Sequence, residues 1–378
     1  MKIEETPDDF QALETAGAVP PIPSSAEAME MVGGPAPRIA IDSAELTQAE
    51  LDLRAERETR ETVTEGQALS PLQASMRRLG RDRRAMFFLA TVLIIIVVSY
   101  VGPLIYTHIG PNIMGGAAGL TPEVPSQYHN YVWNDLSRTD APSSSLHWLG
   151  TDAIGRDLLA RIMAGVNVSI EVALLVEILD ICLGVAIGTL AGFYGGWLAT
   201  FLDRFTDLMF AFPGLLFAIL AAATLGPAFQ QKLGLPGRLV LVALALGISV
   251  WPFMARLVRG QTLQLREQQF IEASRTVGSS DRRIIMSHIV PNLFNIVIVA
   301  AALDVVNTIV SEAVISLLGL GVQTPGSSLG LMINDAVSQI AINPWEVIWP
   351  TLVLTVLVLA FSFMGDGIQD AFNPRTKD

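Results

Sequence analysis

A short glycine-flanked serine motif is the first feature of the chain that could do chemistry. Residues 326–330 read Gly-Ser-Ser-Leu-Gly and match the G-x-S-x-G pattern of a hydrolase nucleophile elbow. That chemistry requires a strand-to-helix turn beneath Ser328 and a histidine later in the chain. The last of the four histidines is His288, so none follows the serine. We therefore interpret the stretch as a Gly/Ser-rich turn between two apolar segments and disfavour an intramembrane hydrolase.

A P-loop, a zinc-binding histidine pair and a multi-cysteine metal site are also missing from the sequence. A P-loop needs lysine followed by serine or threonine, and the only lysines, Lys2, Lys232 and Lys377, are followed by Ile, Leu and Asp. The histidines form no H-E-x-x-H pair for zinc. A single cysteine, Cys182, excludes an internal disulfide and a multi-cysteine metal site. We predict a non-catalytic chain without a metal or cofactor of its own.

A charged loop between two long apolar stretches carries the most specific spacing in the sequence. Residues 270–278 read Phe-Ile-Glu-Ala-Ser-Arg-Thr-Val-Gly, and nine residues later His-Ile-Val-Pro occupies 288–291. Glycine permits a sharp backbone turn, so Gly278 predicts a helix–turn–helix. We predict Asp281 as the N-cap of a second helix that runs to Pro291. An ordinary basic loop would account for the arginines of this stretch but not for its spacing.

Five acids lie within or beside the apolar segments of the chain, namely Glu171, Glu177, Asp180, Asp304 and Glu312. Glu177 and Asp180 are three residues apart, so they share one face of a helix. Ionisable groups inside a membrane are costly and usually face the protein interior or water. One interpretation is that Glu177 and Asp180 line a transport pathway and complement the cationic amino terminus of a peptide. The alternative is hydrogen bonding between helices, or a position near the water interface.

Three glycines recur every four residues in the apolar segment 169–193. Gly184, Gly188 and Gly192 therefore lie on one helix face. Small residues at this spacing allow two helix backbones to approach closely. We predict a helix-packing face, and a smooth lining of the pathway is the alternative.

The elements that position these residues follow from the apolar composition. The 378-residue chain is 51% hydrophobic and only 16% charged, against about 25% charged residues in soluble domains. About 20 apolar residues in a helix cross a hydrocarbon core of about 30 Å, and lipid offers the backbone no other partners. The sequence therefore predicts an all-α integral membrane protein with six transmembrane helices. The predicted spans are 86–106, 169–193, 208–228, 239–258, 292–316 and 346–366.

The acidity of the chain is confined to its start. The formal net charge is −12, and residues 1–70 alone contribute −10 through 15 acids and 5 bases. Low hydrophobicity and several prolines predict an acidic, disordered tail over residues 1–69. The remaining chain has a net charge near zero. It offers no basic domain that could neutralise phosphates, which disfavours a nucleic-acid binder.

The arginines predict how the chain is oriented. Five precede the first span and six lie between positions 256 and 283, whereas the opposite side carries five basic residues in all. The positive-inside rule then places both termini and the 259–291 loop in the cytoplasm. The predicted organisation is a basic segment with the first span at 70–106, an external loop at 107–167, and a core permease domain at 168–378.

With this loop and these spans, the sequence resembles the permease subunits of ATP-binding-cassette importers. Their loop signature is Glu-Ala-Ala, three residues, Gly, nine residues, an apolar residue and Leu-Pro; here Ser274 replaces the second alanine. Further segments resemble the C-type permease of dipeptide, oligopeptide and nickel importers. These are His-Trp-Leu-Gly-Thr-Asp-Ala-Ile-Gly-Arg-Asp at 147–157 and Gly-Asp-Gly-Ile-Gln-Asp at 365–370. The resemblance covers residues 70–378.

The resemblance implies the type I importer permease fold and a transport role. It implies that the 259–291 loop docks on a cytoplasmic ATPase, with coupling residues Glu272, Ala273, Gly278, Asp281 and Pro291. It also implies a second, homologous permease subunit, two ATP-binding subunits that hold ATP and Mg, and an external substrate-binding protein. The expected location is the inner membrane of a bacterial or archaeal cell.

The expected cargo is di- or oligopeptides, with nickel or another small solute as the alternative. A stand-alone secondary transporter or channel is a less favoured possibility, because such a carrier has no need for an ATPase-docking loop.

Overall fold

The computed structural model describes residues 71–113, 129–234 and 236–372, which belong to one compact unit from Leu69 to Asp378. The predicted acidic tail at 1–69 lies outside the described residues. In the described part the chain is helical, and its only β-type pairing is an isolated bridge between Thr151 and Asp157. The prediction of an all-α chain is therefore confirmed.

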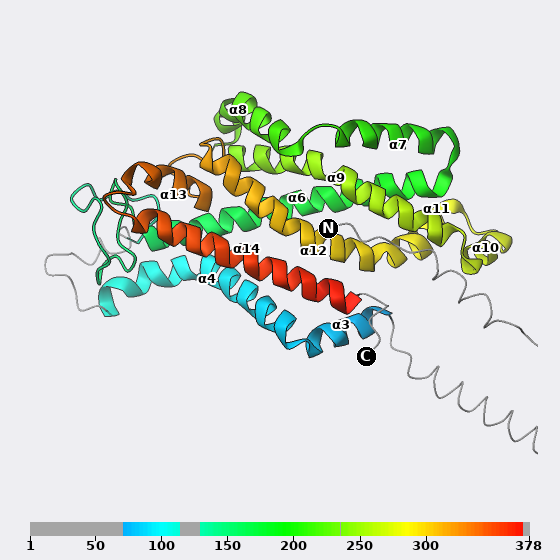
Figure 1. Cartoon of the computed structure of the whole chain (residues 1–378), viewed down its shortest axis with the longest axis horizontal. Coiled ribbons are helices and arrows are strands. Elements are labelled where there is room, and N and C mark those ends of the chain that lie inside the picture. Colours follow the sequence, from blue (N-terminus) through cyan, green and yellow to red (C-terminus); the bar gives the residue numbers. More distant parts are fainter. Residues whose placement is uncertain (1–70, 114–128, 235, 373–378) are drawn as a thin grey trace, which may run out of the picture. The chain divides into compact units, whose positions relative to one another are not determined.

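Eight longer helices and several short ones make up the described part of this unit (Figure 1). The longer helices are α3 (Pro71–Arg81), α4 (Arg83–Ile113), α6 (Leu158–Tyr194), α7 (Gly196–Phe210), α8 (Gly214–Leu233), α9 (Pro236–Arg266), α12 (Val290–Leu317) and α14 (Trp345–Phe372). The short ones are α10 (Gln269–Thr276), α11 (Asp281–Ile284), a π-helical turn (Ile285–Ile289), α13 (Leu329–Ala336) and a 3-10 turn (Val337–Gln339).

Five of the helical stretches are long and apolar enough to cross a membrane by length and composition. They are Arg83–His108, Gly214–Leu233, Pro236–Arg266, Asp281–Leu317 and Trp345–Phe372. The remaining predicted span, 169–193, lies within α6, which is 37 residues or about 55 Å long. Helix α6 contacts α4, α7, α9, α12 and α13, so protein covers much of its surface. That position explains how a helix with several ionisable residues is accommodated in an apolar bundle.

The third predicted span differs from the structure at its start. The prediction ran through residues 208–228, but α7 ends at Phe210 and α8 begins only at Gly214. Pro213 lies between them with an extended backbone (φ −65°, ψ 103°). Proline has no N–H to donate, so a helix cannot continue through it without losing a hydrogen bond. The hydropathy pattern alone does not indicate this interruption between α7 and α8.

The predicted glycine face on α6 is confirmed as a packing face against α9. A Cβ atom at Gly192 would lie 2.7 Å from Cβ of Thr262, and one at Gly188 would lie 2.9 Å from Cβ of Val258. A side chain at Gly184 would overlap with Met254. The two helices therefore approach each other more closely than any larger residue would allow.

A buried charged network closes the end of the bundle that carries α13. Oδ2 of Asp152 accepts hydrogen bonds from Nε of Arg156 (2.7 Å) and Nη1 of Arg161 (2.6 Å). Both guanidinium groups also reach Oδ2 of Asp335, at 3.2 and 2.9 Å. Asp157 caps the start of α6, since its Oδ1 accepts from the backbone N–H of Ala160 at 2.8 Å. The 147–157 stretch thus fixes one end of α6.

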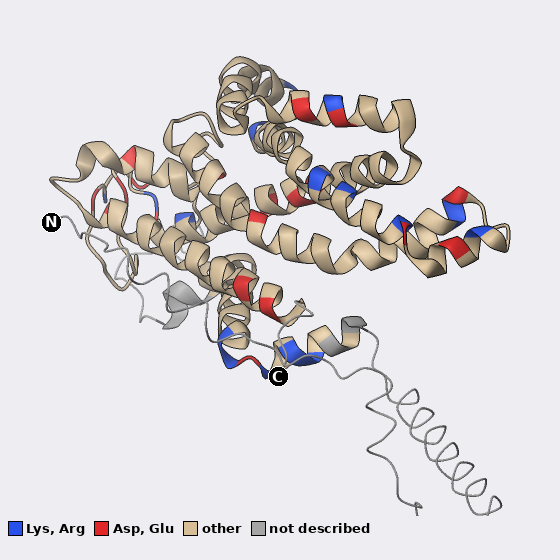
Figure 2. Ribbon diagram, turned by 45° about the vertical axis from the view of Figure 1, so that its right-hand side comes forward, with Lys and Arg blue, Asp and Glu red and all other residues tan. Residues whose placement is uncertain are grey.

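The predicted external loop at 107–167 is partly helical in the structure. Helix α4 continues to Ile113, and α6 already begins at Leu158. Charge-coloured ribbons show long uncharged stretches along the helices, interrupted by a few charged residues within the bundle (Figure 2).

Ser328 has a structural role at the beginning of α13. Its Oγ accepts a hydrogen bond from the backbone N–H of Leu331 at 3.2 Å, and the residue is fully buried. A serine at this position satisfies one of the free N–H groups of a helix start. The G-x-S-x-G stretch therefore forms a helix cap and not the strand-to-helix turn of a hydrolase.

Candidate functional site

The loop between α9 and α12 folds into a short helix, a glycine turn and a second helical segment. Helix α10 begins at Gln269, directly after α9 ends at Arg266, and both α10 and α11 lie at one end of the bundle (Figure 1). Gly278 adopts φ +85°, which L-residues rarely adopt. The predicted turn at this glycine is confirmed.

Two backbone hydrogen bonds define how α10 ends. The N–H of Ser279 donates to the carbonyl of Ser274 at 3.0 Å, and the N–H of Gly278 donates to the carbonyl of Arg275 at 2.9 Å. This is the Schellman pattern, in which a glycine just past the helix satisfies its last carbonyl groups. An ideal Cβ at Gly278 would meet no atom within 4 Å, so the need for glycine here is conformational and not steric.

The predicted N-cap role of Asp281 is wrong. Ser280 occupies the N-cap position without a side-chain hydrogen bond, and Asp281 is the first residue of α11. A carboxylate in the first turn still interacts favourably with the positive end of the helix dipole. The segment also continues past Pro291, which lies in the first turn of α12, where proline is tolerated.

Apolar residues anchor the loop to the bundle. Ile271 of α10 has no exposed surface, and Ile284 and Ile289 are equally buried. They pack in one cluster with Met254 of α9 and Leu293 of α12. Burying a side chain of this size contributes about 1.5–3 kcal/mol, so α10 is held firmly although it is only eight residues long.

Two arginines tie the loop to the end of α6. Nη1 of Arg266 donates to the carbonyl of Phe193 at 3.2 Å and lies 3.4 Å from that of Gly192. The guanidinium carbon of Arg275 lies 5.4 Å from the centre of the Phe193 ring. A cation in this position is attracted to the ring face. Arg275 of α10 and Arg266 at the end of α9 therefore both contact the end of α6.

The outer surface of the loop is open to a partner. Glu272 and Ala273 are exposed on α10, and Val277 is 86% exposed. Phe270 and Met286 add exposed apolar surface. Exposed apolar side chains beside charged ones are typical of surfaces that bind another protein.

Ser274, where the resemblance leads one to expect alanine, links the two segments of the loop. Its Oγ donates to the carbonyl of Phe270 at 2.9 Å and lies 3.4 Å from Nε2 of His288. The serine therefore adds a polar contact between α10 and the π-helical turn.

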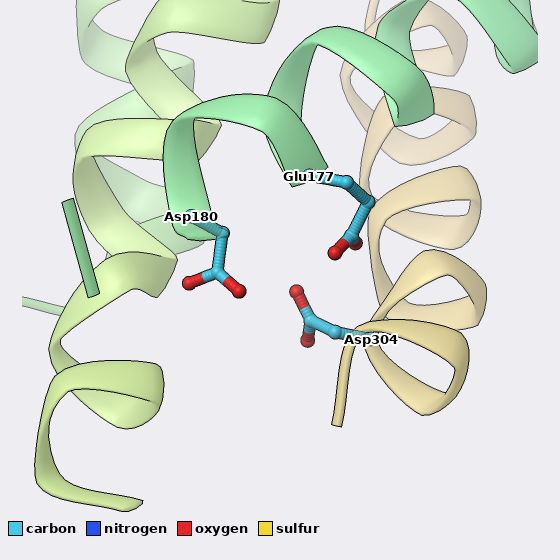
Figure 3. A group of neighbouring side chains, drawn as sticks. All are labelled: Glu177, Asp180 and Asp304. Atoms are coloured by element: carbon cyan, nitrogen blue, oxygen red, sulfur yellow. The ribbon is translucent and has the colours of Figure 1, made fainter. Parts of the chain in front are cut away.

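The second group of predicted residues lies in the interior, between α6 and α12. Glu177 is 6% exposed and Asp180 is 2% exposed. Both carboxylates turn toward Asp304 of α12, which is half-buried (Figure 3). One oxygen of each of the three residues lies within 4.8 Å of the others. We call Glu177, Asp180 and Asp304 the acid cluster.

The acid cluster has few hydrogen bonds in the described part of the chain. Both oxygens of Glu177, Oδ1 of Asp180 and Oδ2 of Asp304 are buried and have no partner there. Glu312 of α12 is a useful contrast, since it accepts from Ser169 at 3.0 Å and from Ser316 at 2.7 Å. Hydrogen bonding between helices thus describes Glu312 but not Glu177.

Sequence reasoning identifies Asp304 as an acid within an apolar segment but does not join it to Glu177 and Asp180. The spacing rule links residues on one helix, whereas Asp304 reaches the cluster through the packing of α12 on α6. The available signal was an acid in the middle of the apolar stretch 292–316.

Comparison with known protein families gives two matches that together cover most of the chain. Residues 184–378 match the family described as binding-protein-dependent transport system inner membrane component. Residues 70–114 match the N-terminal TM domain of oligopeptide transport permease C.

Individual proteins agree with these matches. The oligopeptide transport system permease protein OppC of Haemophilus influenzae is 32% identical over 82% of this chain and 93% of its own length. The glutathione transport system permease protein GsiD of Escherichia coli O1:K1 is 33% identical over 83% of this chain and 94% of its own length. Among solved structures, the MetNI methionine ABC transporter in an inward-facing conformation matches 57% of this chain, with 20% identity and a TM-score of 0.44.

Proposed function

Because this chain belongs to the family of binding-protein-dependent transport system inner membrane components, we propose that it is the C-type permease subunit of an importer for di- or oligopeptides. The matched relatives are named for transport of oligopeptides and of glutathione, which is itself a peptide. Shared peptide chemistry supports this cargo over nickel or another small solute. The family assignment disfavours a stand-alone secondary transporter.

The observation that carries the proposal is the construction of α10. One side of this helix is fixed to the bundle through Ile271, while Glu272 and Ala273 face outward. In the proposed mechanism an ATPase subunit grips this outer surface. ATP binding closes two such subunits, the closure moves α10, and Arg266 and Arg275 pass the movement to α6. ATP and Mg are held by the partner ATPases, and hydrolysis resets the cycle.

The proposed assembly contains this chain, a homologous second permease, two ATP-binding subunits and an external substrate-binding protein. The proposed orientation in the bacterial or archaeal inner membrane places both termini and α10 in the cytoplasm. It is supported by Arg275, Arg282 and Arg283 at the α10 end of the bundle, since arginines are enriched on the cytoplasmic side. In this orientation the network around Asp152 and Arg161 faces outward, toward the binding protein.

A charge reversal on α10 tests the docking role. We expect Glu272→Arg to release the ATPase subunits when the complex is purified and to abolish ATP-dependent peptide uptake. Asp366→Arg is the matched control, because Asp366 is an exposed acid of α14 outside the loop. Retention of all subunits by both variants, or full transport by this chain without ATPases, would refute the proposal.

The cargo needs its own experiment, because the binding protein selects it in this mechanism. We expect the cognate binding protein to copurify with peptides of two to several residues, identified by mass spectrometry. Uptake competed by glutathione alone would narrow the peptide cargo to glutathione. Uptake competed by Ni²⁺ alone would replace the peptide assignment and leave the coupling mechanism intact.

A further inference from the structure

The acid cluster places three carboxyl groups in the apolar interior of the bundle, where a negative charge is most unfavourable. Its three carboxylates come from the middle parts of α6 and α12 and point toward one another (Figure 3). In the described part of the chain, none of the salt bridges to Lys, Arg or His involves any of them. Glu177 is nine-tenths buried and both of its oxygens lack a hydrogen-bond partner.

Either a positive charge from outside the chain or protons on the carboxyl groups would relieve this arrangement. Buried carboxylates that are neither paired nor hydrogen-bonded are strongly unfavourable, and three together also repel one another. Glu312 shows how the same bundle treats an ordinary buried acid, because two serines hydrogen-bond its carboxylate. The cluster has one such contact, from Nδ2 of Asn307 to Oδ1 of Asp304 at 3.4 Å.

The geometry favours a small inorganic ion over the amino group of a peptide. Hard divalent cations bind oxygen ligands at about 2.0–2.6 Å, so ligands on opposite sides of one ion lie up to about 5 Å apart. The cluster offers oxygens within 4.8 Å of one another, and half-buried Asp304 gives access from one side. An apolar cavity of about 460 Å³ is lined by residues such as Ile181 and Val297. None of the three acids lines it, so this cavity does not present the carboxylates to a peptide.

We propose that Glu177, Asp180 and Asp304 bind one hard divalent cation of the Mg²⁺ or Ca²⁺ type, with water completing its shell. The ion joins α6 to α12, and one end of each of these two helices adjoins the loop between α9 and α12. Helix α12 follows that loop directly, and α6 contacts it through Phe193. A bound ion would make the two helices respond to α10 as one body. The proposal goes beyond the peptide-import function and assigns Glu177 and Asp180 to a fixed site and not to the pathway lining.

Mn²⁺ is a suitable probe, because it accepts similar oxygen ligands and is visible by electron paramagnetic resonance. The intact transporter complex would be stripped with a chelator, kept free of nucleotide and titrated with Mn²⁺. We expect the wild type to bind one Mn²⁺ more per permease chain than Asp304→Asn, or that variant to bind it at least tenfold more weakly. Glu171→Gln is the control, since Glu171 is an exposed acid of α6 outside the acid cluster. Metal sites on the ATPase subunits are the same in all variants, so their Mn²⁺ binding cancels when the variants are compared.

A stability measurement separates ion binding from misfolding. Asp304→Asn removes one charge from the cluster, so without metal this variant should unfold at the same temperature as the wild type or higher. Mn²⁺ should then raise the unfolding temperature of the wild type and of Glu171→Gln but not that of Asp304→Asn. Equal Mn²⁺ stoichiometry and affinity in all three proteins would overturn the proposal. Binding of a dipeptide that depends on Asp304, is lost on N-acetylation and occurs without any Mn²⁺ binding would also overturn it, in favour of a peptide site.

Discussion

Replacing Gly278 by alanine tests whether backbone conformation alone makes this glycine necessary. At φ +85° an L-residue is disfavoured by about 1–2 kcal/mol. A Cβ there meets nothing within 4 Å, so no steric cost is added. Gly260 in α9 is the matched control, because its Cβ position is equally open but its backbone is helical. There the same substitution should stabilise the helix by about 0.5–1 kcal/mol.

Hydrogen exchange at the amides of α10 measures this difference locally, in the intact complex. A loss of 1–2 kcal/mol corresponds to about 5- to 30-fold faster exchange, if opening is at equilibrium. We expect that acceleration for Gly278→Ala and a slowing or no change for Gly260→Ala. Gly278→Asn should lie between Gly278→Ala and the wild type, because asparagine tolerates the left-handed region better than alanine does.

The ranking of these variants decides the argument. If Gly278→Ala exchanges like the wild type, the turn does not need its left-handed residue, and another feature must end α10. If Gly278→Asn is more damaging than Gly278→Ala, side-chain size and not backbone conformation governs the position. Either result would refute the reasoning from φ and the open space around the glycine.

Three further substitutions test the packing that surrounds the loop and α6. Ile271→Ala should destabilise the attachment of α10 by about 2–5 kcal/mol, seen as faster exchange, whereas Val277→Ala, at an 86% exposed position, should change stability by less than about 0.5 kcal/mol. Gly188→Ala should lower the unfolding temperature, since its Cβ would collide with the α9 backbone at a cost of about 1–3 kcal/mol. Arg161→Met should cost about 3–5 kcal/mol in thermal unfolding, because it leaves the buried carboxylate of Asp152 without one of its two cations. Unchanged stability in any of these three variants would contradict the packing at that position.

The sequence predicts the presence of the long helices well and their ends poorly. Long apolar stretches determine where a helix can be buried, and such stretches are visible in the sequence alone. Helix ends depend on local backbone chemistry that hydropathy ignores. Pro213 interrupts the predicted 208–228 span, and α4 extends to Ile113, beyond the predicted end at 106.

In the candidate site, features set by neighbouring residues are predictable, and contacts between distant segments are not. Gly278 was predictable because a glycine turn depends on one residue and its neighbours. The preference of aspartate for helix starts predicts Asp281 as the N-cap, but the extended residue before α11 is Ser280. Asp304 was not assigned to the cluster because its contact with Glu177 exists only when α12 packs against α6. Contacts between segments far apart in the chain leave no periodic signal.

The proposed coupling and ion site make different demands on α6. At the α13 end, Asp157 caps the helix and the Asp152–Arg161 network holds it in place. At the α10 end, the carbonyl and ring of Phe193 contact two arginines of the loop. A displacement imposed at α10 must therefore either tilt α6 about its fixed end or slide it past α12. A cation shared by Glu177 and Asp304 would resist any movement of α6 alone, because sliding α6 past α12 and tilting α6 away from α12 both separate the ligands. The ion site thus predicts a rocking motion of α6 and α12 together, and removal of its ligands should weaken coupling without releasing the ATPases.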